Sequence, residues 1–216
     1  MAGPVAFPRP LVPLPARLAV LISGRGSNFE SLADACAREE IPARIVLVAS
    51  DVPTAPGLAK ARARGISSKV IGTGPTSTRA EREAELGDFL LEARADLICL
   101  AGFMRILSAA FVARWPLRIL NVHPSLLPSF PGLEAQAQAL EYGVRVTGAT
   151  VHFVDAGTDS GPIVAQAAVP VHPGDDAQAL AARILPVEHA LYAAAVRRVL
   201  EGGWRISGRR VVFPGS

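Results

Sequence analysis

The sequence predicts a single-domain α/β protein with a mostly parallel central sheet of about seven strands and helices on both faces. From Arg17 onward, short apolar runs rich in β-branched residues alternate with longer stretches at helical spacing, which is typical of βαβ units. The run at 96–102 is almost continuously apolar, as in a parallel strand that is covered on both faces. With 50% hydrophobic residues, a chain of 216 residues can bury one substantial core.

In the first half of the chain, each predicted strand comes before a helix. Strands are predicted at 18–23, 44–50 and 68–72, and the helices that follow them at 28–38, 56–64 and 79–94. The runs at 96–102 and 118–123 then form the centre of the sheet. After Gly148, the runs at 149–155 and 162–171 alternate regularly around a turn-rich segment, which indicates antiparallel strands or an edge hairpin. A last helix is predicted at 176–202 and a closing strand at 209–213.

The composition indicates in which cellular compartment the chain works and which classes of partner it binds. Residues 1–16 contain five prolines and no secretory pattern, so they are predicted as a disordered Pro-rich extension that precedes one domain at 17–216. No apolar run reaches the roughly eighteen residues of a membrane helix. The net charge of +3 is spread over many segments, which gives little support to a nucleic-acid surface. Cys36 and Cys99 lack metal-site spacing and are read as buried free thiols, so we expect a metal-free cytoplasmic protein.

The segment 23–28, SGRGSN, is the first candidate for a ligand site. It follows the first strand and opens the first helix, where glycines allow tight backbone geometry and the helix N-terminus attracts anions. Phe29 replaces the last glycine of a dinucleotide fingerprint, and no Walker lysine follows. The segment is therefore either a phosphate site or a plain turn with Ser27 or Asn28 as the helix N-cap.

Asn121, His123 and Asp159 are the candidate catalytic residues. Asn121 and His123 lie two apart at the end of a strand, so their side chains share the face at which open α/β sheets bind ligands. Such a histidine can move protons, and the amide can donate to an oxyanion. The alternatives are a packing loop with a capping histidine, and an Asp159 that only stabilises its turn. His152, on a predicted strand, is read as a packed or hydrogen-bonded sheet residue.

Five segments carry a family resemblance: LISGRGSN, LAGFMRILS, NVHPSLLPSFPG, TGATVHFVD with DSGP, and EHALY, in this order. Together they resemble the phosphoribosylglycinamide formyltransferase family, whose fold is a formyltransferase fold with a Rossmann-like N-terminal half. The resemblance covers nearly everything from Arg17 onward. It implies transfer of a formyl group from 10-formyltetrahydrofolate to glycinamide ribonucleotide in purine synthesis, without a metal, by a monomer or homodimer that acts on small molecules.

The resemblance also assigns roles to residues. Asn121, His123 and Asp159 would be the catalytic trio. Gly26, Ser27 and Asn28 would bind the phosphate of the acceptor, and Glu188 its ribose. The folate would contact the following residues: Arg79, Met104, Arg105, Ile106, Leu107, Asn121, Asp155, Ala156, Gly157, Thr158 and Asp159.

Two departures from the family pattern affect the expected contacts. Family members often carry histidines just after the Pro-Gly of the catalytic loop, where this chain has LEAQ at 133–136. Pro186 lies beside the expected ribose contact. The competing interpretations are methionyl-tRNA formyltransferase and formyltetrahydrofolate deformylase, both of which carry an additional domain, and a non-catalytic nucleotide- or folate-binding module.

Overall fold

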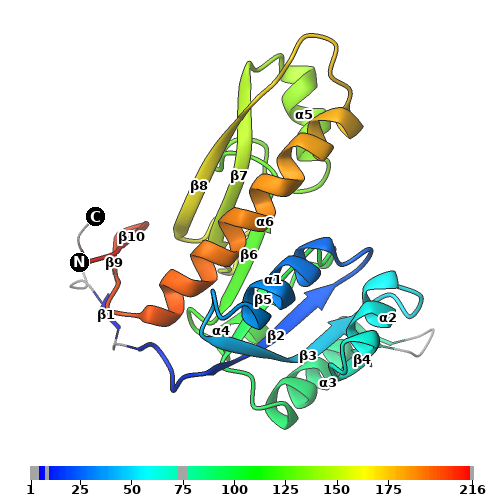
Figure 1. Ribbon diagram of the computed structural model, residues 1–216, viewed down its shortest axis with the longest axis vertical. Coiled ribbons are helices and arrows are strands. Elements are labelled where there is room, and N and C mark those ends of the chain that lie inside the picture. Colours follow the sequence, from blue (N-terminus) through cyan, green and yellow to red (C-terminus); the bar gives the residue numbers. More distant parts are fainter. Residues whose placement is uncertain (1–4, 8–9, 73–76, 215–216) are drawn as a thin grey trace. The chain divides into compact units, whose positions relative to one another are not determined.

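The computed structural model describes residues 5–7, 10–72 and 77–214. The chain divides into two compact units, and the first consists of Val12–Leu120. The second joins the N-terminal stretch Met1–Leu11 to Asn121–Ser216. The chain therefore leaves the second unit after residue 11 and returns to it at residue 121 (Figure 1).

The unit Val12–Leu120 is built on parallel strands in the order β5-β2-β3-β4. The strands are β2 (Ala16–Ile22), β3 (Ala43–Ser50), β4 (Ser68–Val70) and β5 (Leu97–Leu100). The helices are α1 (Ser27–Ala37), α2 (Pro56–Ala63), α3 (Arg79–Glu92) and α4 (Ala109–Ala113). Leu97, Ile98, Cys99 and Leu100 are all buried, as the continuous apolar run predicts for a central parallel strand.

Local sequence signals explain where the helices of this unit begin. Thr78 and Glu81 form a capping box at the start of α3, in which the Thr78 hydroxyl accepts from the Glu81 N–H and the Glu81 carboxylate accepts from the Thr78 N–H. Ser108 caps α4 by accepting the Phe111 N–H at 3.1 Å. Pro56 starts α2, where its missing N–H costs nothing.

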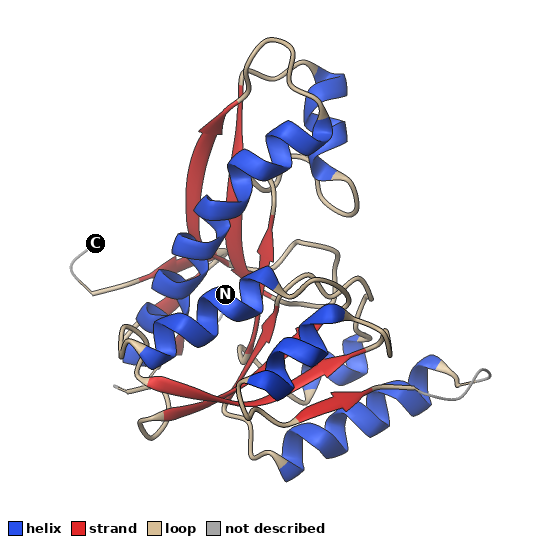
Figure 2. Ribbon diagram, turned by 45° about the vertical axis from the view of Figure 1, so that its right-hand side comes forward, coloured by secondary structure: helices blue, strands red, loops and turns tan. Residues whose placement is uncertain are grey.

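The second unit has the strand order β1-β9-β10-β8-β7-β6. Its elements are β1 (Val5–Ala6), β6 (Ile119–His123, which begins in the other unit), α5 (Ala135–Tyr142), β7 (Val146–Phe153), β8 (Ile163–Pro170), α6 (Ala177–Glu201), β9 (Arg205–Ser207) and β10 (Arg210–Val212). Strands β7 and β8 are antiparallel, which confirms the predicted antiparallel pair, but β10 pairs with β8, so the pair does not form an edge hairpin. Helix α6 runs along them (Figures 1 and 2), and Leu180 and Ile184 pack against Ala149 and Val169.

The α/β class and the parallel arrangement of the first half are confirmed. The described residues contain ten strands instead of about seven. The predicted closing strand is β10, and the short strands β1 and β9 were not predicted. Part of the predicted disordered extension is ordered as well. Strand β1 pairs with β9, and the Phe7 ring stacks on Trp204 with the ring centres 4.0 Å apart. Residues 1–4 and 8–9 of that extension lie outside the described residues.

Helix α6 is long and apolar enough to cross a membrane by length and composition alone, with 25 residues and a mean hydropathy of 1.3. No continuous apolar run of about eighteen residues was expected from the sequence, and in α6 the apolar residues are interrupted by Arg183, Pro186 and Glu188. A core helix passes the same test, and α6 places Leu180, Ile184, Tyr192 and Val196 in the core.

Candidate active site

Strand β6 places Asn121 and His123 on one face, because alternate residues of a strand point to the same side. His123 is 5% exposed, and Asn121 is half-buried. The chain then enters the proline-containing loop that leads to α5, in which the Leu127–Pro128 peptide is cis. The Ser125 hydroxyl donates to the Ser129 carbonyl at 2.5 Å, which closes the first part of this loop on itself.

His123 is held through both ring nitrogens. Its Nε2 lies 2.8 Å from the carbonyl oxygen of Phe130, and since a carbonyl only accepts, Nε2 carries a hydrogen. Its Nδ1 lies 3.4 Å from Oδ2 of Asp159. In the neutral ring Nδ1 is therefore the bare nitrogen, so Nδ1 is the atom that can take up and release a proton. Phe130 adopts φ +54°, a left-handed conformation that is unusual for a bulky residue.

Asp159 lies in the turn between β7 and β8 and also has a positive φ, of +49°. The Gly132 N–H donates to its Oδ2 at 2.8 Å, which ties this turn to the loop after β6. Burial raises the pKa of Asp159, but hydrogen bonds from His152 and from the Gly132 N–H, with the charges of His123 and His152, leave the pKa below its ordinary value. Asp159 is therefore a carboxylate at neutral pH.

His152 on β7 completes this polar cluster and was missed as a site residue. It is buried and hydrogen-bonded in the sheet, as expected, but its partners are the catalytic candidates. Nδ1 donates to the Phe153 carbonyl at 2.8 Å, so the neutral ring has a bare Nε2, which lies 3.2 Å from Asn121 Nδ2 and 3.5 Å from Asp159 Oδ1. Neutral His152 accepts from Asn121, and protonated His152 can donate to Asp159.

The amide of Asn121 has a fixed orientation in this cluster. Its Nδ2 faces Asp159 Oδ1 at 3.4 Å, and because a carboxylate only accepts, the nitrogen and not the oxygen must face it. The shorter contact goes to His152, so the hydrogen directed at Asp159 is the more weakly held of the two. This hydrogen is the one available to an oxygen that develops negative charge nearby.

Glycine and a local hydrogen-bond network fix the turn that carries Asp159. The Asp155 carboxylate accepts from the Gly157 N–H at 3.0 Å and from the Ser160 hydroxyl at 2.7 Å. A Cβ on Gly161 would lie 1.8 Å from the Phe153 carbonyl oxygen, so no other residue fits there without a shift of the backbone. Residues 155–158, expected near the folate, therefore belong to the same turn as Asp159.

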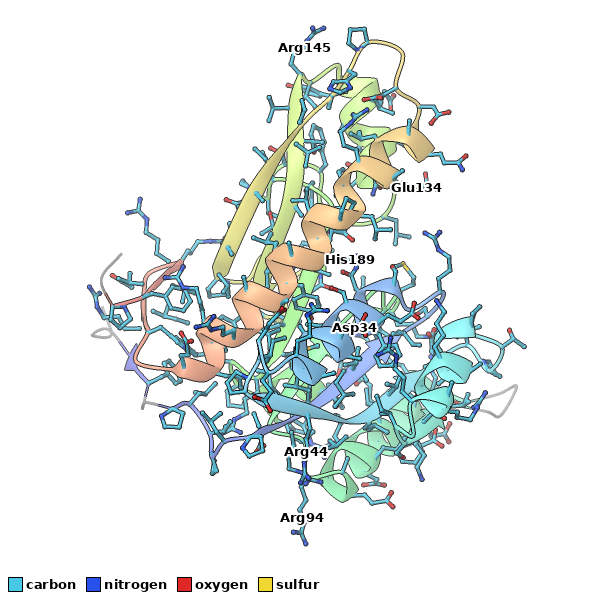
Figure 3. The ribbon with its side chains drawn as sticks, in the orientation of Figure 1. Asp34, Arg44, Arg94, Glu134, Arg145 and His189 are labelled. Atoms are coloured by element: carbon cyan, nitrogen blue, oxygen red, sulfur yellow. The ribbon has the colours of Figure 1, made fainter. Side chains whose placement is uncertain are left out.

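The LEAQ segment at 133–136 leads into α5, a helix that was not predicted from the sequence. Glu134, labelled in Figure 3, precedes the helix with φ +55°. Leu133 is 70% exposed, and the Gln138 amide donates to the Leu133 and Pro131 carbonyls at 2.8 and 3.1 Å. In this protein, hydrogen bonds from the Gln138 side chain to backbone carbonyls thus hold the region where family members often carry histidines.

The SGRGSN segment lies between β2 and α1, in the unit Val12–Leu120. Gly26 is the N-cap of α1 with φ +73°, and no side chain caps the helix. The alternative in which Ser27 or Asn28 is the N-cap is therefore wrong. A Cβ on Gly26 would lie 2.9 Å from the Cα of Gly57, so glycine is needed for this close approach to α2. The N-terminus of a helix attracts negative charge, so this position is consistent with an anion site.

Arg79 and the residues 104–107 meet in one cavity of the same unit. The cavity has a volume of about 350 Å³, within the range of small-molecule sites. Its lining combines apolar side chains with three arginines and two carboxylates: Asp51, Ile71, Arg79, Arg82, Glu83, Leu86 and Phe103 to Leu107. The structure thus brings together the expected folate residues that belong to this unit.

Glu188 is a buried carboxylate on α6, 8% exposed, in the same unit as the trio. Buried carboxylates are rare without partners, and Glu188 does have an interaction. Within residues 5–7, 10–72 and 77–214, no group of three or more His, Cys, Asp or Glu side chains is arranged to hold a metal ion.

Comparisons with known proteins match most of the chain. The family model described as formyl transferase matches residues 16–196, a stretch that contains Asn121, His123, His152 and Asp159. The phosphoribosylglycinamide formyltransferase of Haemophilus influenzae is 39% identical over 200 residues, which cover 93% of this chain and 94% of that protein. The crystal structure of glycinamide ribonucleotide transformylase 1 from Symbiobacterium toebii has a TM-score of 0.89 at 48% identity and covers 92% of this chain and 93% of that one.

A longer relative is also similar. The trifunctional purine biosynthetic protein adenosine-3 of Drosophila melanogaster is 50% identical over 193 residues, or 88% of this chain. The chain spans 14% of the length of that protein. The similarity thus extends to one part of a multifunctional protein as well as to nearly the whole of a bacterial one.

Proposed function

Because this chain belongs to the formyl transferase family, we propose that it transfers the formyl group of 10-formyltetrahydrofolate to the amine of glycinamide ribonucleotide. The products are N-formylglycinamide ribonucleotide and tetrahydrofolate, a step of purine synthesis. The observation that carries the proposal is the cluster in which Asp159 faces both Asn121 and His123, at 3.4 Å each. An amide donor, a titratable ring and a fixed carboxylate are the groups that acyl transfer to an amine requires.

In the proposed reaction, the amine nitrogen of the acceptor forms a bond to the formyl carbon, whose oxygen becomes negatively charged. Asn121 Nδ2 and the protonated Nδ1 of His123 donate to this oxygen. The bond between the formyl carbon and the folate nitrogen then breaks, and the electron pair stays on that nitrogen. His123 helps pass the proton lost by the amine to the folate nitrogen, so the reaction is balanced without a covalent enzyme intermediate.

Asp159 acts on His123 through charge. Its carboxylate lies 3.4 Å from Nδ1 of His123 and forms an ion pair with the ring when the ring carries a second proton. The Phe130 carbonyl fixes the other nitrogen, so the ring presents the same atom, Nδ1, in both protonation states. The 3.4 Å separation is longer than a strong charged hydrogen bond, which leaves the Nδ1 proton available to a third group, such as water or the formyl oxygen.

We assign the ligands to the remaining candidate residues as follows. Gly26, Ser27 and Asn28 at the start of α1 bind the phosphate of glycinamide ribonucleotide, and Glu188 contacts its ribose. Arg79 and residues 104–107, which line the 350 Å³ cavity, bind the folate. Asn121 and residues 155–159 are assigned to the folate by the family resemblance. The proposed enzyme is cytoplasmic and acts on small molecules as a monomer or homodimer.

The test is an assay of purified protein with glycinamide ribonucleotide and 10-formyltetrahydrofolate, or its stable dideaza analogue, followed by the ultraviolet change on deformylation. We expect turnover that depends on the acceptor. In His123→Ala, turnover should fall by about 10³-fold or more while both ligands still bind. His172→Ala is the matched control, because His172 follows β8 on an exposed turn, and it should keep full activity.

Each other outcome favours a different function. Turnover without acceptor would favour formyltetrahydrofolate deformylase. Transfer of the formyl group only to methionyl-tRNA would favour methionyl-tRNA formyltransferase. Binding of both ligands without turnover would favour the non-catalytic module. Any of these results would contradict the proposed reaction.

A further inference from the structure

Three side-by-side strands of the unit Val12–Leu120 end at one cluster of hydrogen bonds. Ser23 follows β2, Asp51 follows β3, and the loop that begins at Gly102 follows β5. The Asp51 side chain is only 7% exposed, although it carries a charge. Since the carboxyl ends of parallel strands meet at one edge of the sheet, this cluster is a consequence of the topology.

Asp51 uses both carboxylate oxygens to hold the loop 103–107. The Ser23 hydroxyl donates to Oδ1 at 2.6 Å, and the Arg105 Nε–H donates to Oδ2 at 2.6 Å. The oxygen of the Ser23 hydroxyl in turn accepts the backbone N–H of Met104 at 2.8 Å. One buried carboxylate thus fixes the backbone of Met104 and the side chain of Arg105.

Apart from these bonds, the loop is held mainly at its ends, where the Gly102 carbonyl accepts the Ser23 N–H at 2.9 Å and Leu107 is buried. Residues 103–107 form neither helix nor strand, and the side chains of Met104 and Ile106 are 62% and 64% exposed. At its far end the Glu83 carboxylate accepts the Ser108 N–H at 2.7 Å. Burial of the Met104 and Ile106 side chains contributes little to holding the loop. The hydrogen bonds of Asp51, Ser23 and Glu83 therefore determine where the loop 103–107 lies as a wall of the cavity.

We propose that Asp51 is a positioning residue for the formyl donor, which sets the affinity of the cavity for the folate by holding Met104 and Arg105. The inference rests on the proposed function, because it assigns the cavity to the folate. Asp51 acts through Ser23 and Arg105, because its side chain is almost fully buried and each of its oxygens accepts from one of these two residues. It takes no part in bond making or proton transfer, so binding of the donor and the rate of the chemical step should respond differently to its loss.

The main test is Asp51→Asn, which keeps the size of the side chain but removes the charge. We expect the Kd of the dideaza folate analogue and the KM of the formyl donor to rise by about tenfold. The KM of glycinamide ribonucleotide and kcat should stay within about twofold of wild type. Asp34→Asn is the matched control, because Asp34 on α1 (Figure 3) is also paired with an arginine, Arg64 at 2.6 Å, but does not line the cavity. Asp34→Asn should leave the Kd of the analogue and the KM of the formyl donor unchanged.

A second variant separates positioning from general stability. Ser23→Ala removes only the link from Asp51 to the Met104 backbone, and it should raise the same Kd by a smaller factor. In the double variant the two effects should be less than multiplicative, because both act through one loop. If Asp51→Asn does not fold, the comparison of Ser23→Ala with wild type decides the question by the same measurement.

Two results would overturn the inference. The first is an analogue Kd that stays at the wild-type value in Asp51→Asn or, if that variant does not fold, in Ser23→Ala. The second is a fall in Tm and kcat in parallel with no change in Kd, which is the signature of a purely structural role. A wild-type protein that binds the analogue but does not formylate the acceptor would contradict the proposed function instead, and the comparison of Kd values would still stand.

Discussion

At the scale of single residues, Asp159 is the charge around which the polar groups of the site are arranged. Its Oδ1 faces Asn121 and His152, and its Oδ2 faces His123 and the Gly132 N–H. These neighbours lower the pKa of the carboxylate in spite of burial. The carboxylate therefore contributes to the stability of the fold as well as to the proposed reaction.

The lowered pKa predicts how stability depends on pH. Because the pKa of Asp159 is lower in the folded chain than in the unfolded chain, its stabilisation is complete above the unfolded value of about 3.9 and is lost as the pH falls through the folded value. We therefore expect thermal melts of wild type to lose Tm more steeply below about pH 4 than melts of Asp159→Asn. Equal slopes of Tm against pH in the two proteins would contradict this assignment.

The sequence was sufficient to find three of the four polar residues of this cluster. Asn121, His123 and Asp159 could be predicted because a strand end and a turn are positions where ligands bind. His152 lies in the middle of an alternating strand, where packing is the more common role. Its partner Asn121 belongs to another strand, and pairing between strands is not encoded locally. Only the structure could therefore reveal that contact.

At the scale of elements, the turn between β7 and β8 determines where Asp159 lies. Gly161 packs against the Phe153 carbonyl at the end of β7, and that backbone atom cannot move aside. The position of the carboxylate thus depends on a residue with no side chain.

Gly161→Ala should displace this turn. We expect the variant to lose activity by about 100-fold and to melt at a lower temperature. Gly87→Ala is the matched control, because its new Cβ would meet only the flexible guanidinium end of Arg114, at 2.8 Å. Gly87 lies inside α3, where alanine favours the helix more than glycine does. Gly87→Ala should therefore keep full activity and have an equal or higher Tm. Full activity of Gly161→Ala, measured in the same assay, would show that the turn can adjust.

Most elements could be predicted within a few residues, and the missed ones are short. Strand β1 has two residues and α4 has five, too few for a periodic pattern. Helix α5 spans Ala135–Tyr142, next to a loop whose prolines and glycine indicated irregular structure. The strand and helix patterns that carry the parallel sheet are longer, and for that reason their positions could be read from the sequence.

At the scale of the whole molecule, both ends of the described chain belong to one unit. Strand β1 pairs with β9, and the fully buried Trp204 contacts the rings of Phe7 and Phe153, with ring centres 4.0 and 5.1 Å away. The sequence predicted disorder here because the first sixteen residues contain five prolines and no secretory pattern. That prediction did not account for a partner about two hundred residues away.

Phe7→Ala tests how much the packing of the N-terminal stretch on Trp204 contributes to the stability of the fold. Loss of the stacked ring should destabilise the fold by about 2 kcal/mol. The chain has two tryptophans, so the fluorescence is best measured in a Trp115→Phe background, in which only Trp204 emits. We expect a red-shifted emission as water reaches Trp204, and a lower Tm. An unchanged spectrum and Tm would mean that Phe7 does not shield this residue.

The discontinuous second unit also fixes an order of events during synthesis on the ribosome. All the residues of the unit Val12–Leu120 have been made before those of the second unit beyond residue 11. Val5 cannot pair with Ile206, its partner in β9, until about two hundred more residues have been added. The N-terminal stretch is therefore among the first to leave the ribosome and among the last to find its place, and a chain stalled before β9 leaves β1 without its strand partner.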